Sequence, residues 1–135
     1  MKASTFLETA VLNHFFRNQP QTPAAQVFVA LFISDPTDDN VGTEIQGGGY
    51  ERQPIAFSAP VQVPAQTGTK GQISNNGEIR FPVATTSWGT ISHFGVVTAA
   101  SGGSLLAHAP VPIPKLIEIG DEAKFHVGTL TVSID

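Results

Sequence analysis

The sequence predicts a single domain of mainly β structure, an antiparallel β-sandwich or jelly-roll-like fold with one N-terminal amphipathic α-helix. The chain has 135 residues, a length that suits one hydrophobic core. After Tyr50, short apolar segments are separated by turn signals, which is typical of a sandwich or barrel. One segment near the N terminus has the apolar spacing of a helix. We therefore treat residues 1–135 as one β-rich domain.

The helix is expected at about residues 5–18. Thr5, followed three residues later by Glu8, has the pattern of a capping box, whose side chains satisfy the amide groups left free at a helix start. Two prolines follow Asn18, so the helix cannot continue beyond that point. The apolar side chains recur on one face: Leu7, Val11 and Phe15, with Leu12 and Phe16 beside them.

Residues 26–34 predict a buried strand at the centre of the core. Its β-branched and aromatic side chains occupy both faces, so we expect a sheet to cover one face and the helix the other. Phe28, Leu31 and Phe32 should be among the most buried side chains. The apolar run is far shorter than the roughly 20 residues of a membrane-spanning helix. The N-terminal stretch also lacks the apolar segment of a signal peptide, and no membrane insertion is expected.

The next segment is expected to be a long, exposed loop. Residues 35–40 form a turn sequence rich in Asp, Pro and Asn. Residues 47–49 are three glycines, which indicate a sharp bend or a close approach of the backbone.

Short strands are expected in the remainder of the chain. Residues 78–81 should form a strand with Ile79 and Phe81 pointing inward. Residues 91–98 and 104–109 should form a hairpin around the turn at residues 99–103. Prolines then occupy every second position from 110 to 114, so that segment should lie at a sheet edge. Residues 129–134 alternate strictly, and this last strand is expected inside the sheet.

The composition favours a subunit of an assembly. Charged residues make up 13% of the chain, about half the share of an ordinary soluble domain. Such a domain either displays Ser, Thr, Gln and Gly on its surface or covers part of that surface with neighbouring subunits, and both fit an assembly. The net charge is −4, and the seven Lys and Arg residues are scattered, which argues against nucleic-acid binding. There is no cysteine, so the fold depends on packing alone.

No residue pattern predicts a catalytic, cofactor or metal site. The four histidines lack the spacing of metal ligands. The glycine run lacks the Gly-Lys-Ser/Thr ending of a phosphate loop, and no Gly-x-Ser-x-Gly motif is present. The acidic loop is the best candidate for calcium, but it matches no EF-hand pattern, which favours a solvated turn. The residues of this candidate are Asp35, Asp38, Asp39, Asn40 and Glu44.

Three side chains near the glycine run are candidates for an interaction patch. Tyr50 and Arg52 are two residues apart in an extended segment, so they share a face and can form one cation–π or hydrogen-bonding patch. Trp88 precedes a glycine at the start of a strand, where an aromatic ring serves either as a lid over the core, the more common use, or as a platform for a sugar.

Ordered sequence blocks along nearly the whole chain resemble a family of small bacteriophage structural proteins described as tail fibre or minor tail proteins. The helix at residues 7–16 and the strand and turn at residues 29–38 match the first blocks of that family. The most distinctive block is a glutamate, Glu44, ahead of the glycine run that ends in Tyr-x-Arg. Residues 88–96, which include His93, and the blocks after residue 101 follow in the order of the family.

The resemblance implies a non-enzymatic virion subunit of the tail fibre or baseplate region, which acts by self-association and by docking to other virion proteins. By analogy with phage fibres, the expected homo-oligomer is a trimer. Two alternatives stay open: a capsid decoration (cement) protein, and a module that binds a host-surface glycan. The protein is expected in the phage particle after synthesis in the host cytoplasm. The residues of the expected interaction or structural patch are Glu44, Tyr50, Arg52, Trp88 and His93.

Overall fold

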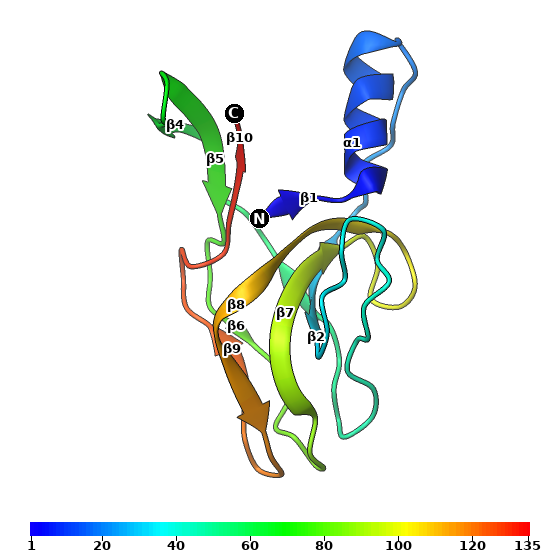
Figure 1. The fold of residues 1–135 in the computed structure, drawn as a ribbon, viewed down its shortest axis with the longest axis vertical. Helices are drawn as coiled ribbons and strands as arrows, with labels where there is room; N and C mark the ends of the chain where they lie inside the picture. The colour runs from blue at the N-terminus through cyan, green and yellow to red at the C-terminus, as the bar shows by residue number, and fades with distance from the viewer.

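The computed structural model describes residues 1–135 and is mainly β, with antiparallel sheets and a short helical segment near the N terminus (Figure 1). This confirms the predicted fold class. The largest sheet has five strands in the order β1-β8-β7-β2-β3. Their bounds are Lys2–Ala3 for β1, Leu105–Ile117 for β8, Gly89–Val97 for β7, Val27–Phe32 for β2 and Gln53–Ile55 for β3.

Two smaller sheets complete the fold. One has three strands, in the order β10-β5-β4, and extends away from the body on the same end as the helix (Figure 1). The other pairs β6 with β9. The bounds are Thr131–Ile134 for β10, Thr69–Ser74 for β5, Val61–Pro64 for β4, Ile79–Arg80 for β6 and Lys124–Phe125 for β9.

Strand β2 lies inside the five-stranded sheet, between β7 and β3, as its apolar sequence predicts. Its last four residues are buried, and Leu31 and Phe32 are only 1% and 2% exposed. The expectation that Phe28 is among the most buried side chains is wrong, because this side chain is only half-buried. It belongs to the start of β2, where the strand is less covered than at Leu31.

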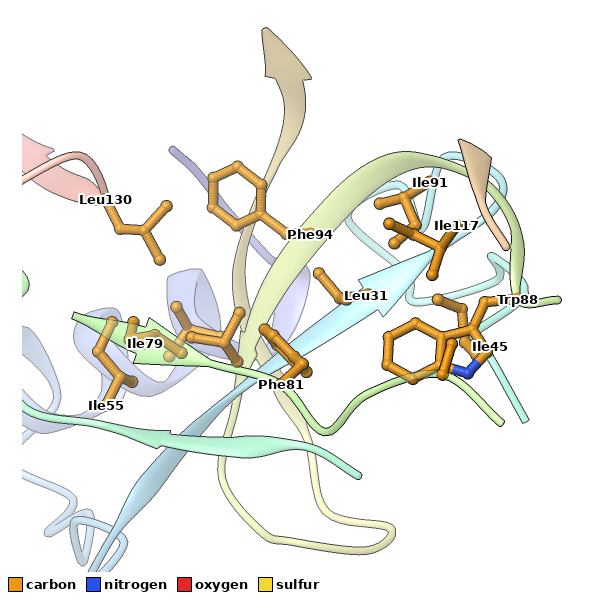
Figure 2. Packing of buried hydrophobic residues seen from close by; sticks show 13 residues of the cluster. Leu31, Ile45, Ile55, Ile79, Phe81, Trp88, Ile91, Phe94, Ile117 and Leu130 are labelled. Atoms are coloured by element: carbon orange, nitrogen blue, oxygen red, sulfur yellow. The ribbon is translucent and has the colours of Figure 1, made fainter. Parts of the chain in front are cut away.

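The main core lies between the five-stranded sheet and the small β6–β9 sheet (Figure 2). Leu31 and Phe94 from the large sheet belong to one buried cluster with Phe81, which follows β6. The ring of Phe125 on β9 lies 5.3 Å from that of Phe94 and 6.3 Å from that of Phe81, so aromatic contacts join the two layers. Ile79 and Phe81 are buried, which confirms the predicted inward face of this short strand.

The N-cap of the helical segment lies one residue earlier than predicted. It consists of α1 (Thr5–Val11) and a wider π-helical turn, η1 (Leu12–Phe16). The N-cap is Ser4, whose side-chain oxygen accepts a hydrogen bond from the Leu7 amide at 3.1 Å. The predicted Thr5–Glu8 capping box is therefore wrong, because the Thr5 hydroxyl instead donates to Asp39.

The helix does not cover β2, contrary to expectation. None of its residues is buried, and Leu12, Phe15 and Phe16 are 56%, 74% and 78% exposed. The preceding strand β1 pairs with β8, which places the start of α1 at the sheet edge and lets the helix project from the body (Figure 1). The second face of β2 packs against side chains of neighbouring strands instead, in a small cluster of Ala30, Phe32, Val97 and Leu105.

The loop after β2 is less exposed than its sequence predicts. Pro36 and Ile45 are buried. The chain returns beside β2, where the Ile45 amide donates to the Leu31 carbonyl at 3.1 Å and Glu44 forms a bridge with Phe32. These backbone pairs extend the same edge of β2 that β3 occupies.

The predicted hairpin is confirmed by the antiparallel pairing of β7 with β8. The pairing shifts register at the prolines: His93 lies opposite Pro110, whereas Ile91 lies opposite Lys115. Four residues of β8 therefore bulge past one residue of β7, because proline lacks the amide donor that a ladder needs.

The expected position of the C-terminal strand is wrong. β10 pairs only with β5 and is an edge strand. Burial fades along the alternating residues, from Leu130 at 2% exposed to Ile134 at 72% exposed, because this sheet leaves the body. Neither α1 nor η1 has the length and hydrophobicity of a membrane-spanning helix.

We predict that Leu31→Ala lowers the free energy of unfolding by about 2 to 5 kcal/mol, because it leaves a cavity in the centre of the core. Phe28→Ala removes a larger but half-buried side chain and should cost less than a buried Phe. Urea denaturation measures both. An unfolding midpoint that Leu31→Ala leaves unchanged would show that the core is misplaced.

Candidate interaction site

Three of the five residues expected in the patch, Glu44, Tyr50 and Arg52, form one hydrogen-bonded cluster. The Arg52 Nε donates to Glu44 Oε2 at 2.9 Å, and Arg52 Nη2 donates to Glu44 Oε1 at 2.7 Å. Both carboxylate oxygens are engaged by one planar guanidinium, which is the strong, orientation-specific form of an ion pair. The Tyr50 hydroxyl also donates to Glu44 Oε2, at 2.7 Å.

The cluster connects three separate segments of the chain. The Leu31 amide donates to the Tyr50 hydroxyl at 3.0 Å, which joins the cluster to β2. Arg52 Nη1 donates to the carbonyls of Ala99 and Gly102, at 2.8 and 2.7 Å, which joins it to the β7–β8 turn. The two carbonyl partners have no signature in the sequence, because any residue supplies a backbone oxygen.

The glycine run brings the backbone against Trp88. All three glycines have positive φ, between 61° and 80°, a conformation that other residues rarely adopt. A Cβ atom on Gly48 would lie 2.6 Å from Thr86 Oγ1 and 2.8 Å from Trp88 Nε1. The absence of a side chain lets Trp88 Nε1 donate to the Gly48 carbonyl at 2.8 Å.

Trp88 lies beneath the cluster as a lid over the core. Its side chain is 5% exposed, and its ring meets that of Tyr50 edge-on at 5.5 Å. Figure 2 shows the indole beside Ile45, with its nitrogen on the side away from Phe81. A ring this buried has no free face on which a sugar can stack, so the lid is the use that the geometry supports.

Burial sets the electrostatics of the cluster. The pKa of Tyr50 is raised well above its ordinary value of 10. Desolvation by burial is the main cause, and the hydrogen bond to Glu44 is the second. The hydrogen bond to Glu44 raises the pKa of Arg52 as well. The side chains of Arg52 and Glu44 are 13% and 21% exposed, so solvent screens this pair less than a surface pair.

His93 lies apart from the Glu44 cluster, in a second polar group that the sequence did not predict. Its Nε2 is 3.9 Å from Asp35 Oδ1, and its Nδ1 is 2.8 Å from the Ser92 hydroxyl. The neighbouring strand supplies His108, whose Nε2 is 2.8 Å from Asp38 Oδ1. The sequence gives little indication of this group, because Asp38 and His108 are 70 residues apart in the chain.

The acidic residues of the calcium candidate point to different partners. Asp38 pairs with Lys2 and His108, Asp39 accepts from Thr5, and Glu44 pairs with Arg52. No group of three or more metal-ligating side chains converges in the structure.

The Glu44 cluster, formed by Glu44, Tyr50 and Arg52, has the chemistry of a structural contact, and we call it the Glu44 joint because it holds separate segments of the chain together. Its donors are directed at acceptors within the chain, and the carboxylate has three donors of its own. An open hollow lies above the joint, lined by Glu44, Ile45, Gln46, Tyr50, Glu51, Arg52, Ala100, Ser101 and Gly102.

Comparison with known proteins gives one match. Residues 2–133 match the model of a protein family described as Podophage GP4 fiber I protein gp80. No curated protein matches the chain.

We predict that Glu44→Ala lowers the free energy of unfolding by about 2 to 4 kcal/mol, because it leaves a largely buried guanidinium and a phenol without their acceptor. Glu51→Gln is the matched control: this exposed neighbour has no side-chain partner, and its replacement should change stability by less than about 0.5 kcal/mol. Chemical denaturation compares the two. Equal stability of both variants would contradict the structural role of the joint.

Tyr50 is the only tyrosine in the chain, so its ionisation can be followed directly by ultraviolet absorbance. Because its pKa is raised in the folded protein, we expect no phenolate signal near pH 10, whereas the chain unfolded in urea should titrate there. The stabilising contribution is fully present below pH 10 and is lost as the pH rises further, by up to about 1.4 kcal/mol per pH unit. A normal titration in the folded protein would contradict the buried hydrogen-bonded geometry.

Proposed function

Since the chain belongs to the podophage fibre protein family, whose members are structural components of the virion, we propose that it is a non-enzymatic subunit of a phage tail fibre that works by self-association and by docking to other virion proteins. The buried centre of such a contact surface is typically apolar and rich in aromatic side chains. The observation that carries the proposal is the projecting helical segment.

The helical segment holds its largest apolar side chains in water. Phe15 and Phe16 are 74% and 78% exposed, and Leu12 beside them is 56% exposed. Fully burying one such side chain contributes about 1.5 to 3 kcal/mol, so a partner that covers all three gains several kcal/mol. Soluble monomers rarely expose apolar groups clustered in this way, and such groups usually mark a contact with another protein.

A second apolar region lies at the opposite end of the molecule. The C-terminal end of β8 points away from α1 (Figure 1). Ile113 and Leu116 in this part of β8, and Ile119 in the turn after it, are 81%, 51% and 71% exposed. Apolar surface at both ends suits a subunit that contacts neighbours on two sides.

The polar cluster supports a non-enzymatic role. Glu44, Tyr50 and Arg52 form their hydrogen bonds with one another and with the backbone of β2 and of the β7–β8 turn. Catalytic groups, in contrast, must present a reactive atom to a substrate.

The two alternatives are less well supported. A glycan-binding module centred on Trp88 and Tyr50 has little aromatic surface to offer, since Trp88 is buried and the ring of Tyr50 packs against Phe81 and Trp88. A capsid decoration protein would also use exposed apolar surface, but the family match favours the fibre. Detection of the protein only in purified heads would overturn that preference.

We predict that the purified protein forms an assembly of two or more copies, three being the number expected from other phage fibres, and that the double substitution Phe15→Ser with Phe16→Ser reduces its mass to that of one chain. Both side chains are exposed in the single chain, so the double variant should fold with nearly unchanged stability. Light scattering over a range of concentrations measures the mass.

Val127→Ser is the matched control, because Val127 is 61% exposed but lies between β9 and β10, apart from the helix. It should assemble like the natural sequence. A natural protein that is monomeric at every concentration would contradict self-association, and a double variant that still assembles would contradict the role of the helix.

A further inference from the structure

The helical segment is held to the sheet at its first turn. Ser4 is 1% exposed, its amide donates to the Leu106 carbonyl at 2.9 Å, and its hydroxyl donates to the Leu105 carbonyl. Its oxygen also caps the helix through the Leu7 amide. The hydrogen bonds of the far end reach only the segment that follows the helix, as where the Gln21 amide donates to His14 Nδ1 at 3.2 Å, and Phe15 and Phe16 stay exposed.

A loop from a different part of the chain holds the same first turn. Residues 35–40 follow β2 and lie below the start of α1, in cyan (Figure 1). The Thr5 amide donates to the Asp38 carbonyl at 2.9 Å, and the Thr5 hydroxyl donates to Asp39 Oδ1 at 2.9 Å. The loop therefore satisfies one of the amide groups that every helix start leaves free.

The side chain of Asp38 joins the loop to two strands. Its Oδ2 is 2.8 Å from Lys2 Nζ on β1, and its Oδ1 is 2.8 Å from His108 Nε2 on β8. The hydrogen bonds from Lys2 and then from His108 lower the pKa of Asp38, so its charge persists in mild acid. Asp35 lies further away, 4.0 Å from His108 Nδ1.

The loop is itself a rigid support. Pro36 is buried, and its carbonyl accepts a hydrogen bond from the Val41 amide at 2.7 Å. Asp35 Oδ1 accepts from the Thr37 amide at 2.9 Å. Gly42 packs so closely on this turn that a Cβ atom would lie 2.6 Å from the Pro36 Cα.

We propose that residues 35–40 act as a clamp that sets the direction of α1, and that docking through the helix depends on this direction. The second part rests on the proposed function, since it takes the exposed face of the helix as the contact surface. A helix that is already oriented loses less conformational freedom when a partner binds, which strengthens the contact without adding any new one.

The test removes the bridging carboxylate with Asp38→Ala. Asp35→Asn is the matched control, because it removes one negative charge from the same loop but keeps the oxygen that accepts from Thr37. Amide hydrogen exchange of residues 5–16 and of β2 is measured for each protein, together with assembly by light scattering. Lys2→Ala is a milder second variant on a side chain that is 68% exposed, so it should fold even if Asp38→Ala does not.

In Asp38→Ala we expect exchange in residues 5–16 to become about ten-fold faster, as for the loss of one charged hydrogen bond, with β2 unchanged and assembly shifted to higher concentration. Lys2→Ala should show the same changes more weakly, and Asp35→Asn should show neither. Exchange at the natural rate in both Asp38→Ala and Lys2→Ala would overturn the clamp. Faster exchange with unaltered assembly would overturn its link to docking. A monomeric natural protein would instead refute the proposed function, and the exchange rates would still decide the clamp.

Discussion

The bidentate contact between Arg52 and Glu44 is the interaction on which the arrangement of the body depends. The segment that carries both residues is a long connection between β2 and β3 with little regular structure, and this contact ties its two halves together. Arg52 also reaches the turn between β7 and β8, while Tyr50 reaches the backbone of β2. The ion pair and the Tyr50 hydroxyl together thus connect a loop, a central strand and a hairpin turn.

The contact between Arg52 and Glu44 requires the glycine run at residues 47–49. Three successive residues with positive φ reverse the chain between Glu44 and Tyr50, and Gly48 leaves room for the indole of Trp88. The joint therefore lies directly on the core, where Tyr50 packs against Trp88 and Phe81. In contrast, the helix and the β4–β5–β10 sheet extend from this body and keep apolar residues in water, which divides the molecule into a packed support and accessible ends.

The features that the sequence predicted are those set by neighbouring residues. The alternation around Ile79 and Phe81, the apolar run of β2 and the two strands around the turn at residues 99–103 each specify a local structure. The shared face of Tyr50 and Arg52 was predictable in the same way. The helix was predicted, but its position was not, because an apolar stripe does not reveal whether its partner lies in the same chain.

The remaining features depend on contacts between distant residues. The Asp38–His108 pair and the place of His93 beside Asp35 follow from the register of β2, β7 and β8, which sequence periodicity does not determine. The edge position of β10 was missed for a related reason. Strict alternation indicates a strand with one covered face, but it does not distinguish a central strand from an edge strand.

The central claim is that the helix, and not the hollow above the Glu44 joint, contacts other proteins in the particle. The chain has no cysteine, so a single cysteine can be placed at Thr9, an exposed helix position, or at Ser101 beside the hollow, and labelled with a maleimide in intact particles. The account predicts that Thr9→Cys is blocked in the particle and reacts after denaturation, whereas Ser101→Cys reacts in both. Free labelling of Thr9→Cys in the particle, with Ser101→Cys blocked, would contradict it.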